Sequence, residues 1–415
     1  MRTNKEYGNK IRFGVVGLLG YSRSHIGQIL MAQNAGEPVE LTAVVAYMRE
    51  KNEKLATELE EKGVKLVSDY DKLLEMKNDI DCITLPVGIP LHTSMGIKAL
   101  EAGFPVYLEK PVSGAIQDAD ALALSEKKSG KKLFIGYQLC FKEVTWELKK
   151  MLASGDIGTI KKIVVVAEWP RTKAYFNRNA WAGKLSINNT IVLDSPLNNA
   201  CAHYINLPLF LVGKEMELSG VPISVESELY RANDIESTDT LSIRIKTEEG
   251  VEIVWIASHA CEKGIGPKFR IEGSKKTVNA DFATKEKTWY EGASGEGEIF
   301  LEDKWGPLNP FVSVAKWLQG DKEIPVCDLK IARAQTVVVN GAHQAPIVDI
   351  PKKYVKEISQ NDGDILVAVD GMNQLLDKCY QEGVLISETS FVEWSQKPTV
   401  ADVRGLKFFK LPNTE

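Results

Sequence analysis

The stretch Val106–Gly114, VYLEKPVSG, places Glu109 and Lys110 side by side at the end of an apolar run. Pro111 follows directly and prevents regular structure from continuing. Such a charged pair belongs either to a solvated loop or to an active site. A lysine there can stabilise a developing alkoxide as an ammonium or, once desolvated, act as a base.

A second group of residues could bind a phosphate. The segment FGVVGLLGYSRSHIG begins inside the apolar run Ile11–Val16. A dinucleotide fold has its glycine turn after this strand, because bare backbone and a helix N-terminus approach the pyrophosphate there. Gly17 and Gly20 fit the pattern GxGxxG, whereas Leu19 and Ser22 occupy the other two glycine positions. An ordinary turn between a strand and a helix is the alternative.

The end of the next apolar run, Leu41–Ala46, bears on cofactor choice. An acidic residue usually stands there and binds the adenosine ribose, but this chain has Ala46 and Tyr47, followed by Arg49 and Lys51. A small residue followed by a basic residue could accommodate a 2′-phosphate. We therefore expect the protein to bind NADP as well as NAD, and the sequence leaves open which cofactor it prefers. The alternative is a solvated helix start.

The segment Glu168–Leu185 is dense in Arg, Asn, Tyr and Trp. A polyol needs planar donors and acceptors for its hydroxyls and an aromatic face for its C–H surface. The residues predicted to contact a sugar are Arg171, Tyr175, Arg178, Asn179 and Trp181. The alternative is a structured loop around one buried tryptophan.

The elements that position these residues alternate in the first part of the chain. We expect strands at Ile11–Val16, Leu41–Ala46, Ile80–Leu85, Val106–Leu108 and Lys132–Tyr137, with helices at 24–33, 52–62, 93–102 and 118–128 between them. Single helices between strands predict a doubly wound parallel sheet, the Rossmann arrangement. Such sheets bind ligands at the carboxyl ends of their strands, where Lys110 lies.

After Tyr137 the pattern changes. The runs Ile160–Glu168, Thr240–Lys246 and Val251–Ala257 favour a second, α+β domain with a large, mostly antiparallel sheet. Further helices are expected at 143–152, 311–318, 329–343 and 365–383. We therefore predict an α/β protein with a cofactor domain over 1–136, a substrate and oligomerisation domain over 137–346, and an extension over 347–415 that packs back on them.

The composition sets limits on function. The 415 residues are 44% hydrophobic and 26% charged, with a formal net charge of −5. This balance argues against nucleic acid or an anionic membrane as the main partner, and no apolar run approaches the roughly 20 residues of a membrane span. The polar start shows no signal peptide, and six scattered cysteines without a CxxC pair suggest reduced thiols in the cytoplasm. No cluster has metal-ligand spacing.

The segment AGFPVYLEKPVSG resembles the glucose–fructose oxidoreductase / inositol dehydrogenase family, Gfo/Idh/MocA, as do Pro86 and His92 around DCITLP. The resemblance covers the first half of the chain clearly and the sheet domain more loosely. It implies an NAD or NADP cofactor, a lysine that reaches the substrate hydroxyl, and a proline peptide that is often cis. The residues expected at the cofactor are Gly17, Leu19, Gly20, Ser22, Arg23, His25, Arg49, Pro86, His92 and Glu109.

The family's second signature is an aspartate and a histidine four residues later, with a glycine between them. Within VLDSPLNNACAHYINLPLFLVG, His203 fits the histidine, and an amphipathic helix is expected from Tyr204 onward. Asn199 and Cys201 stand at the aspartate and glycine positions, and Asp194 lies nine residues before His203. We assign Lys110 and His203 to catalysis, and Asp194 and Asn199 to substrate binding. His259 and His343 either line the cleft or belong to the core.

These features predict an oxidoreductase that transfers a hydride between a nicotinamide and a hydroxyl-bearing carbon of a sugar, sugar derivative or cyclitol. The alternative is a sensor that binds cofactor and sugar without turnover. The strand IKKIVVVAEW is apolar on both faces, with Val164 and Val166 on one and Val165 and Ala167 on the other. In the family this sheet commonly packs against a second subunit, so we expect a homodimer or homotetramer, unless the chain's own helices cover both faces.

Overall fold

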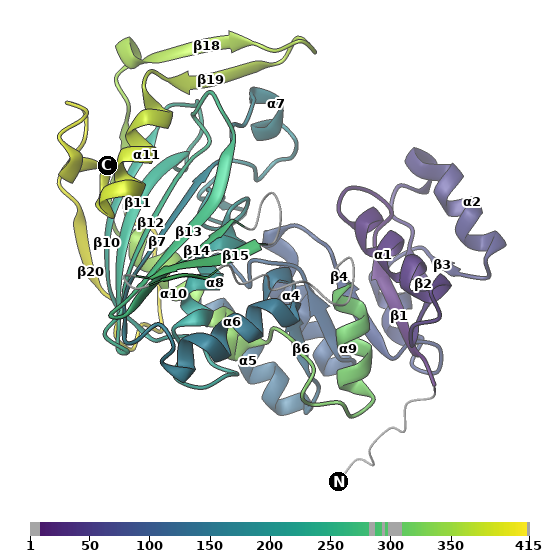
Figure 1. The fold of residues 1–415 in the computed structure, drawn as a ribbon. Helices are drawn as coiled ribbons and strands as arrows, with labels where there is room; N and C mark the ends of the chain where they lie inside the picture. The colour runs from purple at the N-terminus through teal and green to yellow at the C-terminus, as the bar shows by residue number, and fades with distance from the viewer. Residues whose placement is uncertain (1–8, 282–286, 293–294, 298–308, 413–415) are drawn as a thin grey trace. The chain divides into compact units, whose positions relative to one another are not determined.

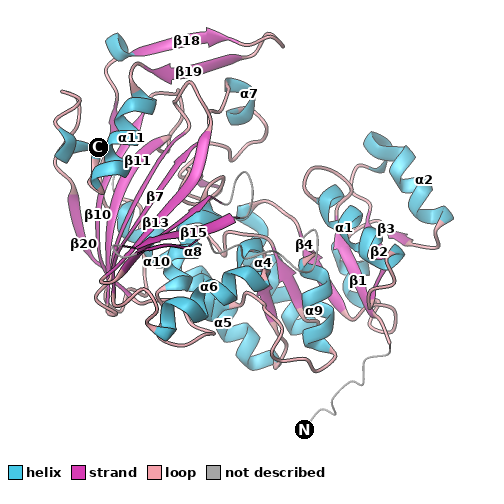
Figure 2. Cartoon of the chain, in the orientation of Figure 1, coloured by secondary structure: helices cyan, strands magenta, loops and turns pink. Residues whose placement is uncertain are grey.

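The computed structural model of the chain describes residues 9–281, 287–292, 295–297 and 309–412. The chain forms two compact units. Unit 1 comprises Met1–Ser113, Asp118–Lys142 and Trp305–Leu329, and unit 2 comprises Gly114–Gln117, Glu143–Lys304 and Lys330–Glu415. Figure 1 shows the described elements with their labels, and Figure 2 distinguishes helices from strands.

Unit 1 contains a six-stranded parallel sheet in the order β3-β2-β1-β4-β5-β6. Its strands are β1 Ile11–Val16, β2 Val39–Val45, β3 Lys65–Val67, β4 Cys82–Leu85, β5 Val106–Leu108 and β6 Leu133–Ile135. The helices between them are α1 Ser22–Asn34, α2 Glu53–Glu61, α3 Tyr70–Glu75, α4 Ile89–Ala102 and α5 Ile116–Ser129. Strands β4, β5 and β6 are buried at every residue, as expected of a sheet with helices on both faces. The predicted Rossmann sheet is confirmed.

A late segment of the chain completes unit 1. Helix α9, Pro310–Leu318, carries the fully buried Phe311, whose ring centroid lies 5.6 Å from Phe13 and 5.0 Å from Tyr107. The Ile135 N–H of β6 donates to the Cys327 carbonyl over 2.8 Å. The sequence prediction differs here, since it placed this segment within 137–346. Phe311 packs onto strands that lie some 200–300 residues earlier in the chain. No local sequence pattern predicts such a contact.

Unit 2 is built on a ten-stranded sheet in the order β16-β15-β14-β13-β7-β12-β11-β10-β17, with β20 also paired to β10. Its strands are β7 Ile160–Glu168, β10 Pro222–Arg231, β11 Thr240–Thr247, β12 Glu252–Ser258, β13 Ile265–Gly273, β14 Lys276–Asp281, β15 Lys287–Gly292, β16 Gly295–Gly297, β17 Ile347–Asp349 and β20 Thr399–Asp402. The pairs β7–β12 and β10–β17 are parallel and the other pairs are antiparallel. The predicted large, mostly antiparallel sheet is confirmed.

Shorter elements surround this sheet. They include α6 Glu143–Ser154, α7 Lys173–Phe176, α8 Ala202–Leu211, α10 Leu329–Ala342, α11 Met372–Glu382, the 3-10 turn η4 Ile386–Thr389 and the hairpin β18 Val355–Ser359 with β19 Ile365–Val369. Two expectations are corrected. The helix expected over 365–383 begins only at Met372, because the β-branched and apolar run ILVAV forms β19 and Gly371, at φ 72°, starts the helix. Helix α8 is buried on almost every side, and is therefore not amphipathic.

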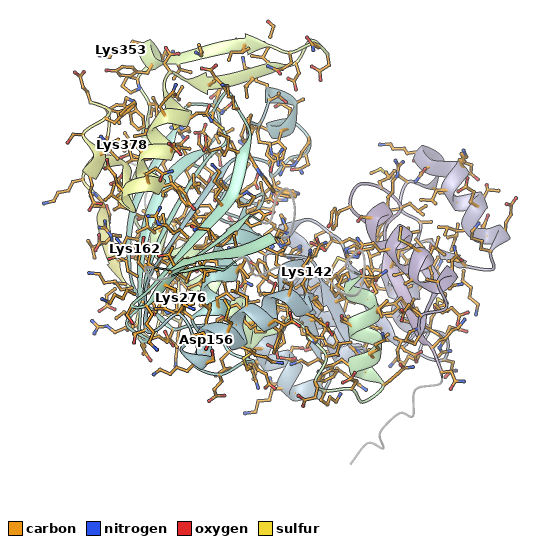
Figure 3. The ribbon with its side chains drawn as sticks, viewed as in Figure 1. Lys142, Asp156, Lys162, Lys276, Lys353 and Lys378 are labelled. Atoms are coloured by element: carbon orange, nitrogen blue, oxygen red, sulfur yellow. The ribbon has the colours of Figure 1, made fainter. Side chains whose placement is uncertain are left out.

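Helix α11 covers one face of the large sheet in unit 2 (Figure 1). Val164 and Val166 of β7 belong to the same buried cluster as Leu375 and Leu376 of α11. Lys162, labelled on β7 in Figure 3, donates from Nζ to the carbonyl of Gly383 just after this helix, over 3.2 Å. The chain's own helix therefore covers the Val164 face, and this face gives no support to the expected dimer.

Two properties of the described residues bear on binding partners. None of the helices within the described ranges is long and apolar enough to cross a membrane. Within the same ranges, no group of three or more His, Cys, Asp or Glu side chains could hold a metal ion.

The packing of α9 gives a test of unit 1. We expect Phe311→Ala to lower the free energy of unfolding by about 3–5 kcal/mol, because a fully buried aromatic ring leaves a cavity. Urea denaturation followed by circular dichroism measures this change. The control is Phe408→Ala, since Phe408 is 67% exposed. Equal effects of the two substitutions would contradict the assignment of α9 to the core of unit 1.

Candidate active site

Lys110 lies directly after β5, in a turn whose backbone is held from α4. The Lys110–Pro111 peptide is cis, as the family resemblance implies. The buried imidazole of His92 donates from Nδ1 to the Pro111 carbonyl over 2.7 Å, and its Nε2 lies 3.0 Å from the Val87 carbonyl. Burial lowers the pKa of His92, so the ring is neutral at pH 7. His92 thus fixes the turn that presents Lys110.

Glu109 connects the same turn to two other elements. Its Oε1 lies 3.0 Å from Nε2 of His25, and its Oε2 accepts from the Lys110 backbone N–H over 3.2 Å. The other ring nitrogen of His25 hydrogen-bonds the hydroxyl of Thr84 in β4. Both Glu109 and His25 are buried. The structure therefore brings His25, Glu109 and Lys110 together at the carboxyl ends of β4 and β5.

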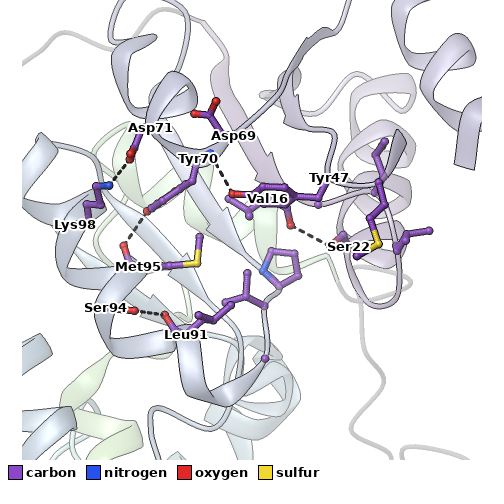
Figure 4. Close-up of a pocket in the computed structure, with 17 residues that line it drawn as sticks. Val16, Ser22, Tyr47, Asp69, Tyr70, Asp71, Leu91, Ser94, Met95 and Lys98 are labelled. Atoms are coloured by element: carbon purple, nitrogen blue, oxygen red, sulfur yellow. Dashed lines mark hydrogen bonds and ion pairs between the residues drawn. The ribbon is translucent and has the colours of Figure 1, made fainter. Parts of the chain in front are cut away.

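A cavity of about 720 Å³ opens at the carboxyl ends of β1, β2, β3 and β4 (Figure 4). Four of the ten residues expected at the cofactor line it, namely Gly17, Leu19, Ser22 and Pro86. The other six lie outside this lining: Gly20, Arg23, His25, Arg49, His92 and Glu109. His92 and Glu109 instead hold the lysine turn, as described above.

The cavity residues fit a nicotinamide dinucleotide. Gly17 adopts φ 102°, and a Cβ there would lie 2.7 Å from Oγ of Ser22. The Ser22 hydroxyl donates to the Val16 carbonyl over 3.0 Å, which ties the first turn of α1 to the end of β1. Backbone without a side chain next to the N-terminus of a 13-residue helix suits a pyrophosphate. The volume lies in the range of cofactor sites.

Several lining residues were not predicted from the sequence. Tyr47 accepts from the Tyr70 N–H through its hydroxyl over 3.2 Å, and the Tyr70 hydroxyl donates to the Met95 carbonyl over 2.8 Å (Figure 4). Asp69 caps α3 by accepting from the Lys72 N–H. Tyr47 follows β2, whereas Asp69 and Tyr70 follow β3, a strand of three residues with none buried, so no apolar run marked β3. The sequence therefore did not indicate that the loop after β3 lines the cavity.

Arg49 is held by two carboxylates. Its Nη1 lies 2.7 Å from Oε1 of Glu60, and its Nη2 lies 3.0 Å from Oε1 of Glu53. The charged residues that line the cavity are Asp69, Asp71 and Lys98, and Lys98 pairs with Asp71. In this arrangement Arg49 is engaged away from the cavity, which disfavours the phosphate-binding role considered for it.

In unit 2, a cluster forms around Asp194, which is only 3% exposed. Its Oδ1 accepts from Nδ2 of Asn199 over 2.6 Å, and its Oδ2 accepts from the Gly183 N–H over 2.6 Å and from Nη2 of Arg178 over 3.4 Å. The Arg178 guanidinium stacks 3.8 Å from the ring centroid of Tyr175. We call Tyr175, Arg178, Trp181, Asp194 and Asn199 the Asp194 cluster.

Two neighbouring residues have different surroundings. The guanidinium of Arg171 lies 4.8 Å from the Tyr175 ring, so it borders the Asp194 cluster. Asn179 uses its side-chain oxygen to accept from the Trp181 and Ala182 N–H groups over 3.0 and 2.8 Å. Its amide therefore supports the local turn.

The structure separates the two histidines left open by the sequence. His259 lies 5.9 Å from Tyr175 and donates from Nδ1 to the Trp169 carbonyl over 2.7 Å. Burial, with the nearby Arg171 charge, lowers the pKa of His259 to about 3. His343 is buried in unit 2 and hydrogen-bonds the Val339 carbonyl over 2.8 Å, as a core histidine does. His259 thus lies beside the Asp194 cluster as a neutral ring.

His203 is the second residue of α8, and the catalytic candidates thus lie in different units, Lys110 in unit 1 and His203 in unit 2. The His203 ring centroid lies 6.2 Å from Tyr204, whose ring lies 5.5 Å from Trp169. Trp169 also stacks with Arg171 at 5.5 Å. Within unit 2, aromatic contacts therefore link His203 to the residues around the Asp194 cluster.

A parallel sheet in this strand order, with a glycine turn beside a cavity at its carboxyl edge, defines a dinucleotide-binding protein. The family profile "Oxidoreductase family, NAD-binding Rossmann fold" (Gfo/Idh/MocA) matches residues 11–137. The profile of the Gfo/Idh/MocA C-terminal domain matches residues 145–279. The chain belongs to the Gfo/Idh/MocA oxidoreductase family and is an enzyme that uses NAD or NADP.

Individual relatives support the same assignment. The chain is 23% identical over 273 residues to the myo-inositol 2-dehydrogenase of Thermotoga maritima, covering 65% of this chain and 75% of the relative. It is 26% identical over 280 residues to the dTDP-3,4-didehydro-2,6-dideoxy-alpha-D-glucose 3-reductase of Streptomyces violaceoruber, covering 68% and 76%. In fold it resembles the WlbA dehydrogenase of Chromobacterium violaceum, solved with NADH and UDP-GlcNAcA, with a TM-score of 0.68, 20% identity and coverage of 83% and 96%.

The environment of Arg49 predicts cofactor preference. We expect the double substitution Glu53→Gln, Glu60→Gln to favour NADP over NAD by about tenfold relative to the wild type, roughly 1.4 kcal/mol, because it frees the Arg49 charge. Calorimetric titration with each cofactor gives the two dissociation constants. Glu58→Gln on the same helix is the control, since Glu58 pairs with Lys54. An unchanged ratio in the double variant would show that a freed Arg49 does not reach the ribose.

Proposed function

We propose that this chain transfers a hydride between NAD or NADP and a hydroxyl-bearing carbon of a sugar, sugar derivative or cyclitol. The observation that carries the proposal is the presentation of Lys110 after β5, in a turn fixed by His92 and Glu109. A lysine held in place by buried groups at the carboxyl edge of a nucleotide-binding sheet is suited to bind a reacting hydroxyl.

The substrate class rests on the Asp194 cluster and on the relatives. Stacked Arg178 and Tyr175 offer planar donors and an aromatic face, and Asp194 and Asn199 offer acceptors and an amide. Arg171 and Trp181 would extend this surface. The matched relatives are named as acting on inositol and on a nucleotide-linked deoxysugar. A polyhydroxylated ring is the substrate that both lines of reasoning share.

The roles we propose for the chain's own residues follow from proton transfer. When bound, the nicotinamide supplies the hydride acceptor or donor. Lys110 donates a hydrogen bond to the substrate hydroxyl and stabilises negative charge on its oxygen. His203 takes up or returns the hydroxyl proton, because imidazole can do so near neutral pH. The two roles are exchangeable if Lys110 becomes desolvated.

The direct test is the absorbance of reduced nicotinamide with a panel of sugars, glycosides and cyclitols. We expect a slow change with at least one of them in the presence of NAD or NADP. A chain that binds cofactor and sugar but shows no absorbance change would instead be a sensor. Mass spectrometry of the small molecules released from the denatured protein tells whether a cofactor is retained on purification. Among the described residues, nothing favours that alternative.

Other features of the protein belong to this proposal. We propose a cytoplasmic location, on the grounds of the six scattered cysteines without a CxxC pair. A homodimer or homotetramer stays a prediction from the family resemblance. So does the assignment of cofactor binding to 1–136 and substrate binding to 137–346, with 347–415 as an extension.

Lys110 provides the first functional test. We expect Lys110→Met to lower turnover by about 10² or more, the usual effect of removing one electrostatic or acid–base group. Cofactor affinity should remain close to that of the wild type, because Lys110 does not line the cavity. Steady-state kinetics and cofactor titration measure the two quantities. Turnover near the wild-type rate would mean that the lysine only supports its turn.

His203 provides an independent test in unit 2. We expect His203→Ala to lower turnover by a similar factor and to flatten the dependence of the rate on pH between about 5 and 8, where imidazole titrates. The matched control is His343→Gln, a buried histidine hydrogen-bonded within its own unit. If the His203 variant keeps the wild-type pH profile, another group transfers the proton.

A further inference from the structure

The hairpin β18–β19 lies beyond both family profiles, which end at residues 137 and 279. It packs against the segment around α7 in unit 2, as Figure 1 shows. Thr172, just before α7, forms an isolated antiparallel bridge with Leu366 of β19. A segment outside the shared family domains therefore contacts the loop that carries the predicted sugar-binding residues.

The contact supplies what α7 lacks by itself. Thr172 is the N-cap residue of α7, but its side chain makes no capping hydrogen bond. Instead, Oδ1 of Asp364, next to β19, accepts from the Ala174 N–H over 3.2 Å. The carboxylate also accepts from the Thr172 hydroxyl, and these bonds hold the pKa of Asp364 below its usual value. An ionised side chain from the hairpin thus caps a four-residue helix that is too short to be stable alone.

A second contact and the hairpin's own anchoring make the support firm. Lys173 pairs through Nζ with Glu357 of β18 over 2.6 Å. At its other end, the hairpin is tied to the loop between β12 and β13, because the Val369 N–H donates to the Ala260 carbonyl over 3.0 Å and Lys356 pairs with Glu262 over 2.8 Å. The hairpin therefore connects this loop of unit 2 to α7.

Helix α7 leads directly into the Asp194 cluster. Tyr175 is the residue after Ala174, and its ring stacks with Arg178, which in turn hydrogen-bonds Asp194. On the N-terminal side, the Arg171 N–H donates to the His259 carbonyl over 3.0 Å. Arg178 also donates from Nη1 to the Tyr175 carbonyl over 2.7 Å, so a shift of α7 would move both side chains relative to Asp194.

We propose that the hairpin β18–β19 positions α7, through Asp364 and Glu357, so that Tyr175 and Arg178 are set for substrate binding. Asp364 and Glu357 are positioning residues, and they act through the helix that they hold. The hairpin thereby contributes to the substrate specificity of this chain. This inference rests on the proposed function, since it assigns the Asp194 cluster to the substrate.

Three substitutions test the proposal. Asp364→Ala removes the cap, Asp364→Asn keeps an oxygen that can accept from Ala174, and Asp377→Asn in α11 is the control because the Asp377 carboxylate accepts from Gln381 of the same helix. The kinetic constants KM and kcat are measured on the full-length protein with each panel member that the wild type turns over, starting with myo-inositol and D-glucose. Hydrogen exchange of the Ala174 amide is measured in parallel.

We expect Asp364→Ala to raise KM about tenfold with kcat changed less than threefold, Asp364→Asn to restore most of the affinity, and Asp377→Asn to behave as the wild type. The Ala174 amide should exchange faster in Asp364→Ala alone. An unchanged KM in Asp364→Ala, or an equal increase in Asp377→Asn, overturns the positioning role and leaves the proposed function intact.

Failure of the proposed function has a different signature. If the wild type turns over no member of the panel, the oxidoreductase assignment to sugars fails, and the exchange measurement then decides about the hairpin by itself. Faster exchange at Ala174 in Asp364→Ala supports the positioning of α7. Wild-type exchange in that variant overturns it.

Discussion

The buried hydrogen bonds around Glu109 and Lys110 are the constraint on which unit 1 depends. A short strand, β5, ends in a turn whose carbonyl at Pro111 is bound by His92 and whose carboxylate at Glu109 is bound by His25. Polar groups buried this deeply are costly unless each finds a partner. The partners come from α1 and α4, so both helices must lie correctly for the turn to form. The position of Lys110 is therefore a property of the whole sheet edge.

Unit 2 solves a different problem. Its large sheet is apolar on both sides at β7, and each side must be covered. Residues near the C-terminus cover one side of the sheet, where α11 makes apolar contacts. The turn η4 is held there by the buried Glu228 of β10, which accepts from the backbone N–H of Ser387 and from the hydroxyl of Ser242. The same C-terminal region contributes the β18–β19 hairpin. Covering the sheet and supporting α7 are thus two tasks of one segment.

The sequence predicted the class of fold and the turn that carries Lys110, because both depend on local patterns. Apolar runs marked five of the six strands in unit 1, and the proline after Lys110 marked its turn. Long-range packing was not predictable in this way. The placement of α9 depends on Phe311 meeting Phe13, and the pairing of Arg49 depends on Glu60 one helix later. β19 was assigned to a helix because ILVAV is uniformly apolar and shows no period.

The order of synthesis gives the packing of α9 a further meaning. The Rossmann sheet of unit 1 is complete in the chain by Ile135, but Phe311 and the Cys327 carbonyl reach it only after about 190 more residues have been made. During translation, the surfaces of Phe13 and Tyr107 that Phe311 covers stay exposed while the strands of unit 2 emerge. Domains generally fold as units during synthesis, and apolar surface exposed at that stage promotes aggregation. Until α9 has been made, the nascent chain therefore carries uncovered aromatic surface on the sheet of unit 1.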